Sequence, residues 1–354
     1  VWLIVFYSFS NILRTTVSQF TKAIGETKLF TIDNMLQTAL ILLLNIIFLS
    51  VFHLGINGYI IGYIMGNFIS AFFVFIYLKL WKYLKYKNIN KAILKSMLIF
   101  SIPLIPNTIC WWISTFADRF MVTNLISAEA NGIYAISYKV PSILVIVVGV
   151  FLQAWQISAN EEFADAGRDK FYTDIFNYLQ AFTFVVSSIL ILSAKMITSI
   201  MVSKEFYVSW EYMPCLLLGI TFFTFGQFLG SVYTANKKTF MAFITNLIVA
   251  IVNIILNLFF IRWWGILGAA IATAISYVVF WISRLIDVKR IVKIKYNYLS
   301  LAIQGILLCV EAIIMTFEIH NYQIYCFICL SIIILVNKKI INKILNKLKK
   351  RLVK

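Results

Sequence analysis

The sequence predicts an all-α integral membrane protein, a bundle of about eleven transmembrane helices, and three observations carry this prediction. Hydrophobic residues make up 62% of the 354 positions and charged residues only 13%, whereas charged residues are about a quarter of an ordinary soluble domain. Apolar runs of about 20 residues recur, which is the length at which a helix crosses about 30 Å of hydrocarbon. The connections between the runs are short, so that none of them is long enough to form a soluble domain.

The apolar runs follow one another along the whole chain, and each is interpreted as one helix. Their ranges are 1–21, 31–53, 57–78, 97–117, 130–157, 175–196, 212–234, 242–261, 266–284, 297–318 and 323–337. The chain has only four prolines, and most breaks between the runs are clusters of Lys, Asn and Gly. This pattern favours long helices with tight connections.

The net charge of +17 is explained by where the basic residues lie. When the lysine-rich connection 79–95 is placed in the cytoplasm, eleven crossings assign a side to every other connection. The cytoplasmic connections and the C-terminal tail then contain 25 of the 31 Lys and Arg residues. This asymmetry is typical of the positive-inside rule, so no nucleic-acid partner is needed to explain the charge. We expect the tail to contact anionic lipid headgroups.

An internal repeat is indicated when the sequence is shifted by 210 residues. The shift lays GINGYII at 55–61 on GILGAAI at 265–271, and KLF at 28–30 near KTF at 238–240. A further adjustment by two residues aligns Thr16, Gln19 and Phe20 with Thr224, Gln227 and Phe228. Both copies have the same orientation under the charge distribution, which predicts a parallel repeat related by an axis along the membrane normal.

The repeat predicts how the chain is organised. Three predicted helices precede the repeated segment in the second half and none in the first, where the chain starts inside an apolar run. We therefore expect an N-terminally truncated member of a two-lobed, six-plus-six-plus-two helix transporter bundle. The expected parts are the last three helices of the N-terminal lobe (1–78), a basic cytoplasmic linker (79–95), a six-helix C-terminal lobe (96–284), two additional transmembrane helices (297–337) and a basic cytoplasmic tail (338–354).

Two segments carry a family resemblance. NIILNLFFIRWWGILGAAIAT at 253–273 resembles the signature of the multidrug/oligosaccharidyl-lipid/polysaccharide exporter superfamily. The segment 101–144 has a proline-containing helix that ends in Asp-Arg, then a Gly-x-Tyr and a second helix with a proline. This pattern resembles the polysaccharide-unit flippases of that superfamily, which handle O-antigen and capsule repeat units.

The resemblance implies a transport function. Such a protein is expected to move an undecaprenyl-diphosphate-linked oligosaccharide across the bacterial cytoplasmic membrane by alternating access between two lobes, for surface polysaccharide synthesis. It is not expected to be an enzyme or to need a cofactor. Its expected partners are the lipid-linked glycan, membrane lipids and other membrane proteins of polysaccharide assembly. The sequence leaves coupling to an ion gradient open.

Polar residues form stripes along three of the apolar helices. Arg14 shares a face of the first helix with Asn11, and similar stripes contain Asn107 in the 97–117 helix and Tyr138 and Gln153 in the 130–157 helix. Such stripes face protein or water rather than lipid. We expect these side chains to line a shared aqueous cavity and bind the substrate, although interhelical packing is an alternative reading for each residue.

Charged residues in or near these helices are the sharper candidates. Arg14 is predicted to bind diphosphate oxygens, for which a guanidinium is well suited, and the alternative is that it snorkels to the headgroups. Lys139, well inside its predicted helix, is expected to line the same cavity. Asp118 and Arg119 are placed at an outer helix end, as a gate between the lobes or as an exposed local pair.

Two rival functions remain open. A multidrug–cation antiporter of the same superfamily would be expected to place a carboxylate deep in a lobe, and the acidic residues other than Glu311 are placed at helix ends. A membrane polysaccharide polymerase or glycosyltransferase would be expected to carry a large outer loop, whereas the outer connections are short. Cys326 and Cys329 form a CxxC without a second ligand pair, so no metal site is predicted, and the sequence contains no phosphate-binding P-loop motif.

Overall fold

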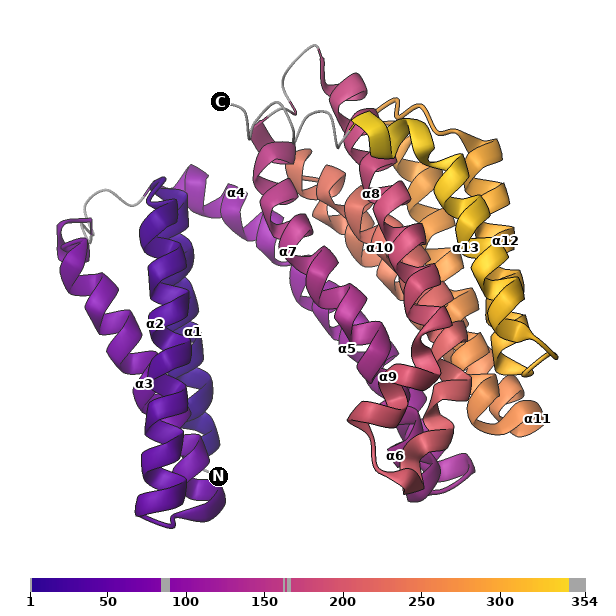
Figure 1. Cartoon of the computed structure of the whole chain (residues 1–354). Helices are drawn as coiled ribbons and strands as arrows, with labels where there is room; N and C mark the ends of the chain where they lie inside the picture. Colours follow the sequence, from indigo (N-terminus) through magenta and orange to yellow (C-terminus); the bar gives the residue numbers. More distant parts are fainter. Residues whose placement is uncertain (1, 84–89, 162, 164–166, 344–354) are drawn as a thin grey trace. The chain divides into compact units, whose positions relative to one another are not determined.

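The computed structural model describes residues 2–83, 90–161, 163 and 167–343, and all regular structure in these ranges is helical (Figure 1). The all-α prediction is therefore confirmed. The chain divides into two compact units, Val1–Leu94 and Lys95–Lys354. The division falls within the segment 79–95 that was predicted as a linker, of which residues 84–89 lie outside the described residues.

The number of membrane spans differs from the prediction. In the described residues, eight helices are long and apolar enough to cross a membrane. The helix α11 (Thr239–Val288) contains two predicted runs, which a non-helical residue, Gly265, divides. Two other predicted runs fall on α1 (Trp2–Ala23), which is not among the eight, and on α13 (Tyr322–Val336), which is shorter. Every predicted run lies on a helix, but eleven spans are not confirmed.

The first unit is a bundle of three helices. These are α1, α2 (Thr27–Ile46), which a π-helical turn over Ile47–Val51 extends, and α3 (Gly55–Tyr77). Gly58, Gly62 and Gly66 lie one turn apart on α3 and are all buried. A Cβ atom on Gly66 would lie 2.7 Å from a side-chain carbon of Ile41 on α2. The small residues therefore let α2 and α3 approach closely, as is common between membrane helices.

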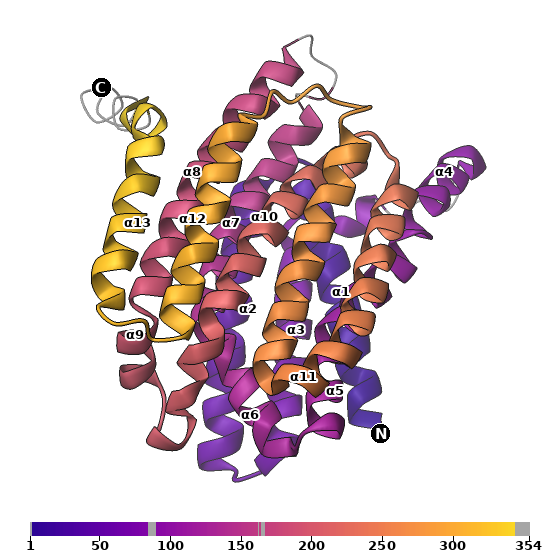
Figure 2. The same ribbon diagram turned by 90° about the vertical axis from the view of Figure 1, so that its right-hand side faces the viewer.

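The second unit is a larger bundle in which α8, α12 and α13 pack together and α10 packs against α11 (Figure 2). Its helices include α5 (Leu104–Leu125), α6 (Ala128–Ser137), α7 (Lys139–Glu161), α8 (Arg168–Leu192), α9 (Ala194–Met201), α10 (Met213–Ala235) and α12 (Tyr298–Thr316). The boundary between the two units falls within α4 (Lys91–Ser101). A 3₁₀ segment, η5 (Lys204–Tyr212), precedes α10.

Three predicted helices are each divided in this unit, and one of them is the run 175–196, which is split between α8 and α9 at Ser193. The run 97–117 is split between α4 and α5 just before Pro103, and the run 130–157 is split between α6 and α7 at Tyr138. The break at Tyr138 is followed by Pro141 in the first turn of α7. Proline suits a first turn because it has no N–H to donate, and it disfavours a helical residue before it.

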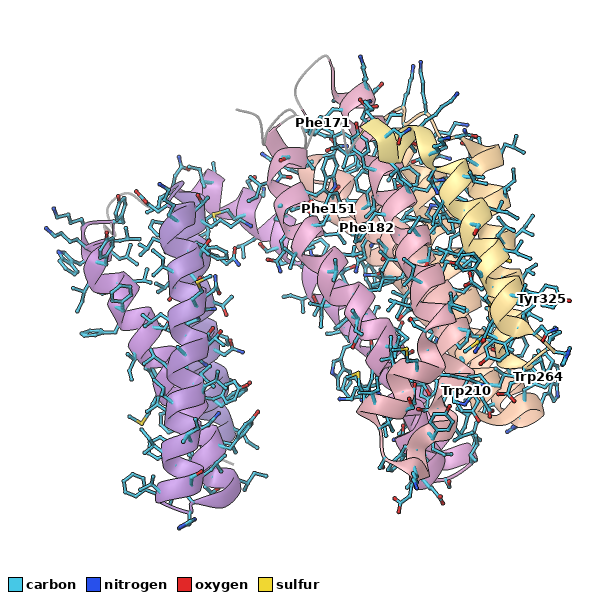
Figure 3. The ribbon with its side chains drawn as sticks, in the orientation of Figure 1. Phe151, Phe171, Phe182, Trp210, Trp264 and Tyr325 are labelled. Carbon is cyan, nitrogen blue, oxygen red and sulfur yellow. The ribbon has the colours of Figure 1, made fainter. Side chains whose placement is uncertain are left out.

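Aromatic side chains fill the centre of the second unit. Trp155 of α7 stacks on Phe228 of α10 with ring centroids 4.6 Å apart, and Phe176 of α8 contacts the same ring at 5.6 Å. Other aromatic residues stay at the surface (Figure 3): Trp264, at the bend of α11, is 52% exposed and Tyr325 is 46% exposed. Exposed Trp and Tyr are typical of the membrane–water interface.

The start of the predicted basic tail contacts α8. The Nζ atom of Lys343 lies 3.6 Å from a carboxylate oxygen of Asp174 and 5.5 Å from the ring centroid of Tyr178. A hydrogen bond with the Tyr178 hydroxyl and the charge of Asp174 raise the pKa of Lys343, so this lysine stays protonated at physiological pH. The rest of the tail lies outside the described residues.

The predicted repeat has counterparts in backbone geometry. Gly55 and Gly265, which the shift of 210 aligned, have φ values of 56° and 59°. The turns before these segments also correspond: Glu26 N donates to Thr21 O in the first copy, and Lys238 N donates to Tyr233 O in the second. The two bonds are 212 residues apart, so the offset at these turns is 212. The first copy is two residues longer because it contains the π-helical turn Ile47–Val51 and a further turn before Gly55.

This geometry corrects the register predicted for the first helix of each copy. The sequence alignment used an offset of 208 residues there, whereas α1 and α10 end at Ala23 and Ala235, an offset of 212. The two offsets differ by four residues, which is about one helical turn. A shift of one turn keeps each residue on the same face of the helix. The spacing of the polar residues therefore looks the same with either offset and does not reveal the error.

Candidate functional site

Asp118 is the centre of a buried polar cluster in the second unit. The carboxylate lies on α5, seven residues before the helix ends, and the residue is 2% exposed. Its Oδ1 accepts a hydrogen bond of 2.6 Å from Asn257 Nδ2, and its Oδ2 accepts one of 2.7 Å from Thr273 Oγ1 and one of 3.1 Å from the Tyr134 hydroxyl. Three helices, α5, α6 and α11, therefore meet at one carboxylate.

The bend of α11 brings Asn257 and Thr273 to the same carboxylate. Gly265 has a φ of 59°, so the chain reverses there and the two halves of α11 pack against each other. Gly268 lies against the carbonyl of Phe260, and a Cβ atom there would overlap the backbone. The sequence signature that gave the family resemblance is thus a helical hairpin that supplies two of the three donors to Asp118.

The cluster keeps unused oxygen atoms beside the carboxylate. The side-chain Oδ1 atoms of Asn253 and Asn257 are both buried and have no hydrogen-bond partner in the described residues. The Tyr134 hydroxyl also contacts those of Tyr138 and Thr273 at 3.2 Å each. A carboxylate, two free amide oxygens and several hydroxyls are the ligands that a proton or a small hard cation prefers.

The structure corrects the predicted position of Asp118 and Arg119. The sequence placed them at an outer helix end, but α5 continues to Leu125, because the donors on α6 and α11 satisfy the buried carboxylate within the helix. Asp118 does not pair with Arg119, which lies half-buried on the next position. The expected local pair is not formed, and the gate remains untested.

A second cluster surrounds Arg14 in the first unit. Arg14 Nη2 lies 3.0 Å from Asp33 Oδ2 and donates a 2.8 Å hydrogen bond to Asn34 Oδ1. The side chain of Asp33 is 1% exposed and that of Arg14 is 11% exposed, while Ser70 of α3 donates to the other carboxylate oxygen. The guanidinium is engaged by α2 rather than extended toward headgroups, and it joins three helices.

A third cluster surrounds Arg284, which the sequence had placed at the end of a helix in a basic connection. The residue is 3% exposed on α11, and its guanidinium donates to Thr245 Oγ1 at 3.2 Å and to the carbonyl of Gly226 at 2.8 Å. The offset of 212 residues makes Gly226 the counterpart of Arg14, and Thr245 the counterpart of Asp33. Each copy of the repeat therefore ties its three helices together through one arginine, supplied by a different helix.

The remaining predicted site residues lie in several environments. Asn107 accepts a 2.6 Å hydrogen bond from Asn246 of α11, and Tyr138 belongs to the Asp118 cluster. Asn11 is exposed and accepts from Thr15 at 3.3 Å, whereas Lys139 and Gln153 are exposed on α7. The structure brings Tyr138 close to Asp118. Two of the six predicted binding residues, Arg14 and Asn11, belong to the first unit and the other four to the second.

Sequence reasoning missed Asp33, Asn257 and Arg284. Asp33 lies early in the predicted run 31–53 and was treated as a helix-end residue, and Arg284 was counted with the basic connection that follows. A signal was present for Asp33, since it lies on the same turn-spaced face as the buried Ile41 of α2. The signal for Asn257 was its place in the NIILN motif, but the motif does not show which side chain Asn257 contacts.

No family model and no curated protein sequence matches the chain. Solved structures do match. A MATE transporter of Vibrio cholerae, VcmN, has a TM-score of 0.71 at 14% identity, over 82% of this chain and 68% of its own. The lipid II flippase MurJ has a TM-score of 0.61 at 17% identity, over 97% and 72%. A MOP superfamily transporter from Pyrococcus furiosus has a TM-score of 0.66 at 10% identity, over 82% and 69%.

The chain has the fold of the MATE and MurJ transporters. The predicted fold class is therefore confirmed. At identities of 10% to 17% the likeness is one of fold alone. Within this fold, the MATE structure and the MurJ structure differ in how much of the chain they match. MurJ leaves only 3% unmatched, so its match must include most of the region after Val288, where α12 and α13 lie.

Proposed function

We propose that the protein is a membrane transporter that moves a lipid-linked oligosaccharide between the leaflets of the bacterial cytoplasmic membrane. The observation that carries the proposal is the match to a lipid II flippase over 97% of the chain, compared with 82% for a MATE transporter. A resemblance at 101–144 to the polysaccharide-unit flippases supports an undecaprenyl-diphosphate carrier and an O-antigen or capsule unit as cargo.

The Asp118 cluster is proposed as the place where transport is coupled to an ion. Its carboxylate is buried and receives three hydrogen bonds, yet its negative charge has no basic partner in the described residues. The unused amide oxygens of Asn253 and Asn257 lie in the same cluster. A proton or a monovalent cation would neutralise this charge, and its binding would draw α5 and both halves of α11 together.

Within this proposal, Lys139 replaces Arg14 as the first candidate to bind the diphosphate. Arg14 remains a candidate, but its guanidinium is bound by Asp33 and Asn34, so it would have to exchange partners to bind a phosphate. Lys139 is exposed at the start of α7 and needs no such exchange. Lys139 is therefore the first basic residue to test, with Asn11, Asn107 and Gln153 as polar contacts to the sugar.

A multidrug–cation antiporter is the second candidate, and a specific observation favours it. Such a protein was expected to hold a carboxylate deep in a lobe. In the structure, Asp33 is 1% exposed and Asp118 is 2% exposed. The sequence reasoning that set this candidate aside had both residues at helix ends. The two candidates therefore have to be separated by substrate rather than by the position of acidic residues.

The proposal is tested in cells depleted of their own flippase for a surface polysaccharide. We expect the full-length protein to restore surface polymer and to lower the accumulated lipid-linked unit. Lys139→Ala should reduce the restored polymer at equal protein level, while Arg262→Ala, which removes an exposed arginine at the bend of α11, should leave it unchanged. Drug or cation efflux without any restored polymer would instead support the antiporter.

A further inference from the structure

Glu311 is a buried carboxyl group to which neither the fold nor the proposed transport gives a role. It lies on α12, five residues before the helix ends, and is 0% exposed. Both of its carboxylate oxygens are buried, and the polar side chain beside them in the described residues is the hydroxyl of Ser188 on α8. A carboxyl group in a membrane interior that lacks partners is costly when charged.

The surroundings of Glu311 offer no positive charge. The elements that pack against α12 are α8, α10, α13 and η5. The titratable groups that face the carboxyl group are the thiols of Cys326 and Cys329 on α13, and neither carries a positive charge. None of the ion pairs in the described residues includes Glu311. The group is therefore stable in this place only when it carries a proton.

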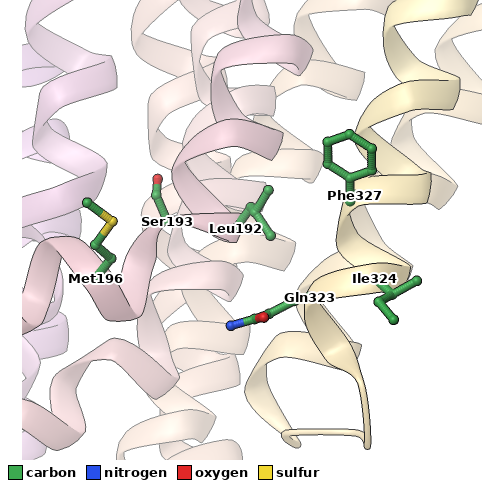
Figure 4. Close-up of a pocket in the computed structure, with 6 residues that line it drawn as sticks. All are labelled: Leu192, Ser193, Met196, Gln323, Ile324 and Phe327. Carbon is green, nitrogen blue, oxygen red and sulfur yellow. The ribbon is translucent and has the colours of Figure 1, made fainter.

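A pocket lies among α8, α9 and α13, and α8 and α13 both pack against α12 (Figure 4). It has a volume of about 540 Å³ and is lined by the end of α8, the start of α9 and the start of α13. Leu192 in its wall is one turn after Ser188, and Ile324 and Phe327 flank Cys326 along α13. One helical turn is about 5.4 Å, so the pocket wall lies about one turn along α8 from Ser188.

Two polar side chains interrupt the mostly apolar wall of the pocket and offer a path for protons. Ser193 and Gln323 supply its polar side chains, and Figure 4 shows the Gln323 amide between α13 and the α8–α9 segment. The charge distribution of the sequence assigns the α12–α13 connection to the outer side of the membrane. Protons would then reach Glu311 from outside the cell.

We propose that Glu311 is a proton-binding site of the α8–α12–α13 helices, filled and emptied through the pocket lined by Ser193 and Gln323. The bound proton keeps the carboxyl group neutral while the three helices are packed together. Loss of the proton leaves a buried charge without a partner, which favours separation of α12 and α13 from α8 until water solvates it. The site is independent of the Asp118 cluster, which lies among α5, α6 and α11.

A hydrophobic carbodiimide tests the proposal on the purified full-length protein in lipid vesicles. This reagent modifies a carboxyl group only in its protonated form, because the carboxyl proton is transferred to the reagent before the oxygen attacks. We expect mass spectrometry to find Glu311 modified at neutral pH, and the modification to fall at least about tenfold as the pH is raised and one carboxyl group titrates. Exposed Glu205 should stay unmodified, and Glu311→Gln should remove the signal.

Three variants complete the test. Glu311→Gln should leave the melting temperature unchanged, because glutamine has the same shape and no charge. Gln323→Leu should slow the loss of modification after a jump to alkaline pH, whereas Tyr325→Phe, on the exposed surface of α13, should not. An unmodified Glu311 in a recovered peptide would overturn the proposal. An equal modification at every pH would also overturn it, since the carboxyl group would then be a permanently protonated packing residue.

Discussion

Three buried carboxyl groups in the described residues differ in what compensates their charge. Asp33 is paired with Arg14, Asp118 receives three hydrogen bonds, and Glu311 has no charged partner in the described residues. The ion pair favours a charged Asp33 with a structural role. The hydrogen bonds stabilise a charged Asp118 that can still bind a cation. The absence of a charged partner favours a neutral Glu311. Burial alone would not distinguish these roles.

The pair of Arg14 and Asp33 predicts a non-additive effect on stability. Arg14→Ala would leave a buried carboxylate without its partner, and we expect it to destabilise the protein by about 3 to 5 kcal/mol. Arg14→Ala combined with Asp33→Asn should cost less than Arg14→Ala alone, because no unpaired charge remains. Thermal unfolding in detergent measures both. Equal losses in the single and double variants would show that Arg14 acts through packing and not through its charge.

At the scale of residues, the sequence identifies polar positions but not their partners. The stripe that contains Arg14 was visible from spacing, and so was Asp118 as a polar residue in an apolar helix. Asp33 was not recognised, because it lies 19 residues after Arg14 on another helix and spacing describes only one helix at a time. For the same reason, neither reading of Arg14, cavity lining or snorkelling, included its acidic partner Asp33.

At the scale of elements, glycine controls how closely the helices pack. Gly268 contacts the carbonyl of Phe260 across the bend of α11, while Gly149 on α7 has nothing within 4 Å of the position where a Cβ would be built. These two glycines form a matched pair inside helices, one in a tight contact and one in open space.

The matched pair gives a prediction about stability. Gly268→Ala forces the two halves of α11 apart, and we expect it to cost about 1 to 3 kcal/mol. Gly149→Ala should stabilise α7 by about 0.5 to 1 kcal/mol, because alanine restricts the unfolded chain more than glycine does. Melting temperatures of the two variants in detergent check the signs. A stabilising Gly268→Ala would contradict the close packing of the bend.

Helix positions were predictable from apolar length, whereas helix ends were not. Each predicted run lies on a helix, because about 20 apolar residues have no other favourable state in a bilayer. The divisions near Pro103 and at Tyr138 occur inside apolar runs, so hydropathy gives no sign of them. The extension of α5 to Leu125 depends on tertiary partners of Asp118, which no local pattern contains.

At the scale of the whole molecule, the repeat links the two units. Both copies turn at a glycine with positive φ, Gly55 and Gly265, and both tie three helices together through one arginine. The arginine of the first copy contacts a carboxylate, whereas Arg284 contacts a hydroxyl and a backbone carbonyl. The copies therefore share an architecture but differ in charge.

The central claim is that this fold moves a lipid-linked oligosaccharide and that Asp118 couples the movement to an ion. The most direct measurement places the full-length protein and an undecaprenyl-diphosphate-linked oligosaccharide in sealed vesicles and follows exposure of the glycan to an oxidant that cannot cross the membrane. We predict that exposure rises beyond the outer-leaflet share when a proton or sodium gradient is applied, and that Asp118→Asn lowers this rate at least about tenfold, equivalent to about 1.4 kcal/mol. Glu129→Gln, at an exposed position of α6, should have no effect. Exposure limited to the outer leaflet under every gradient, from protein that is folded and inserted, would contradict the account.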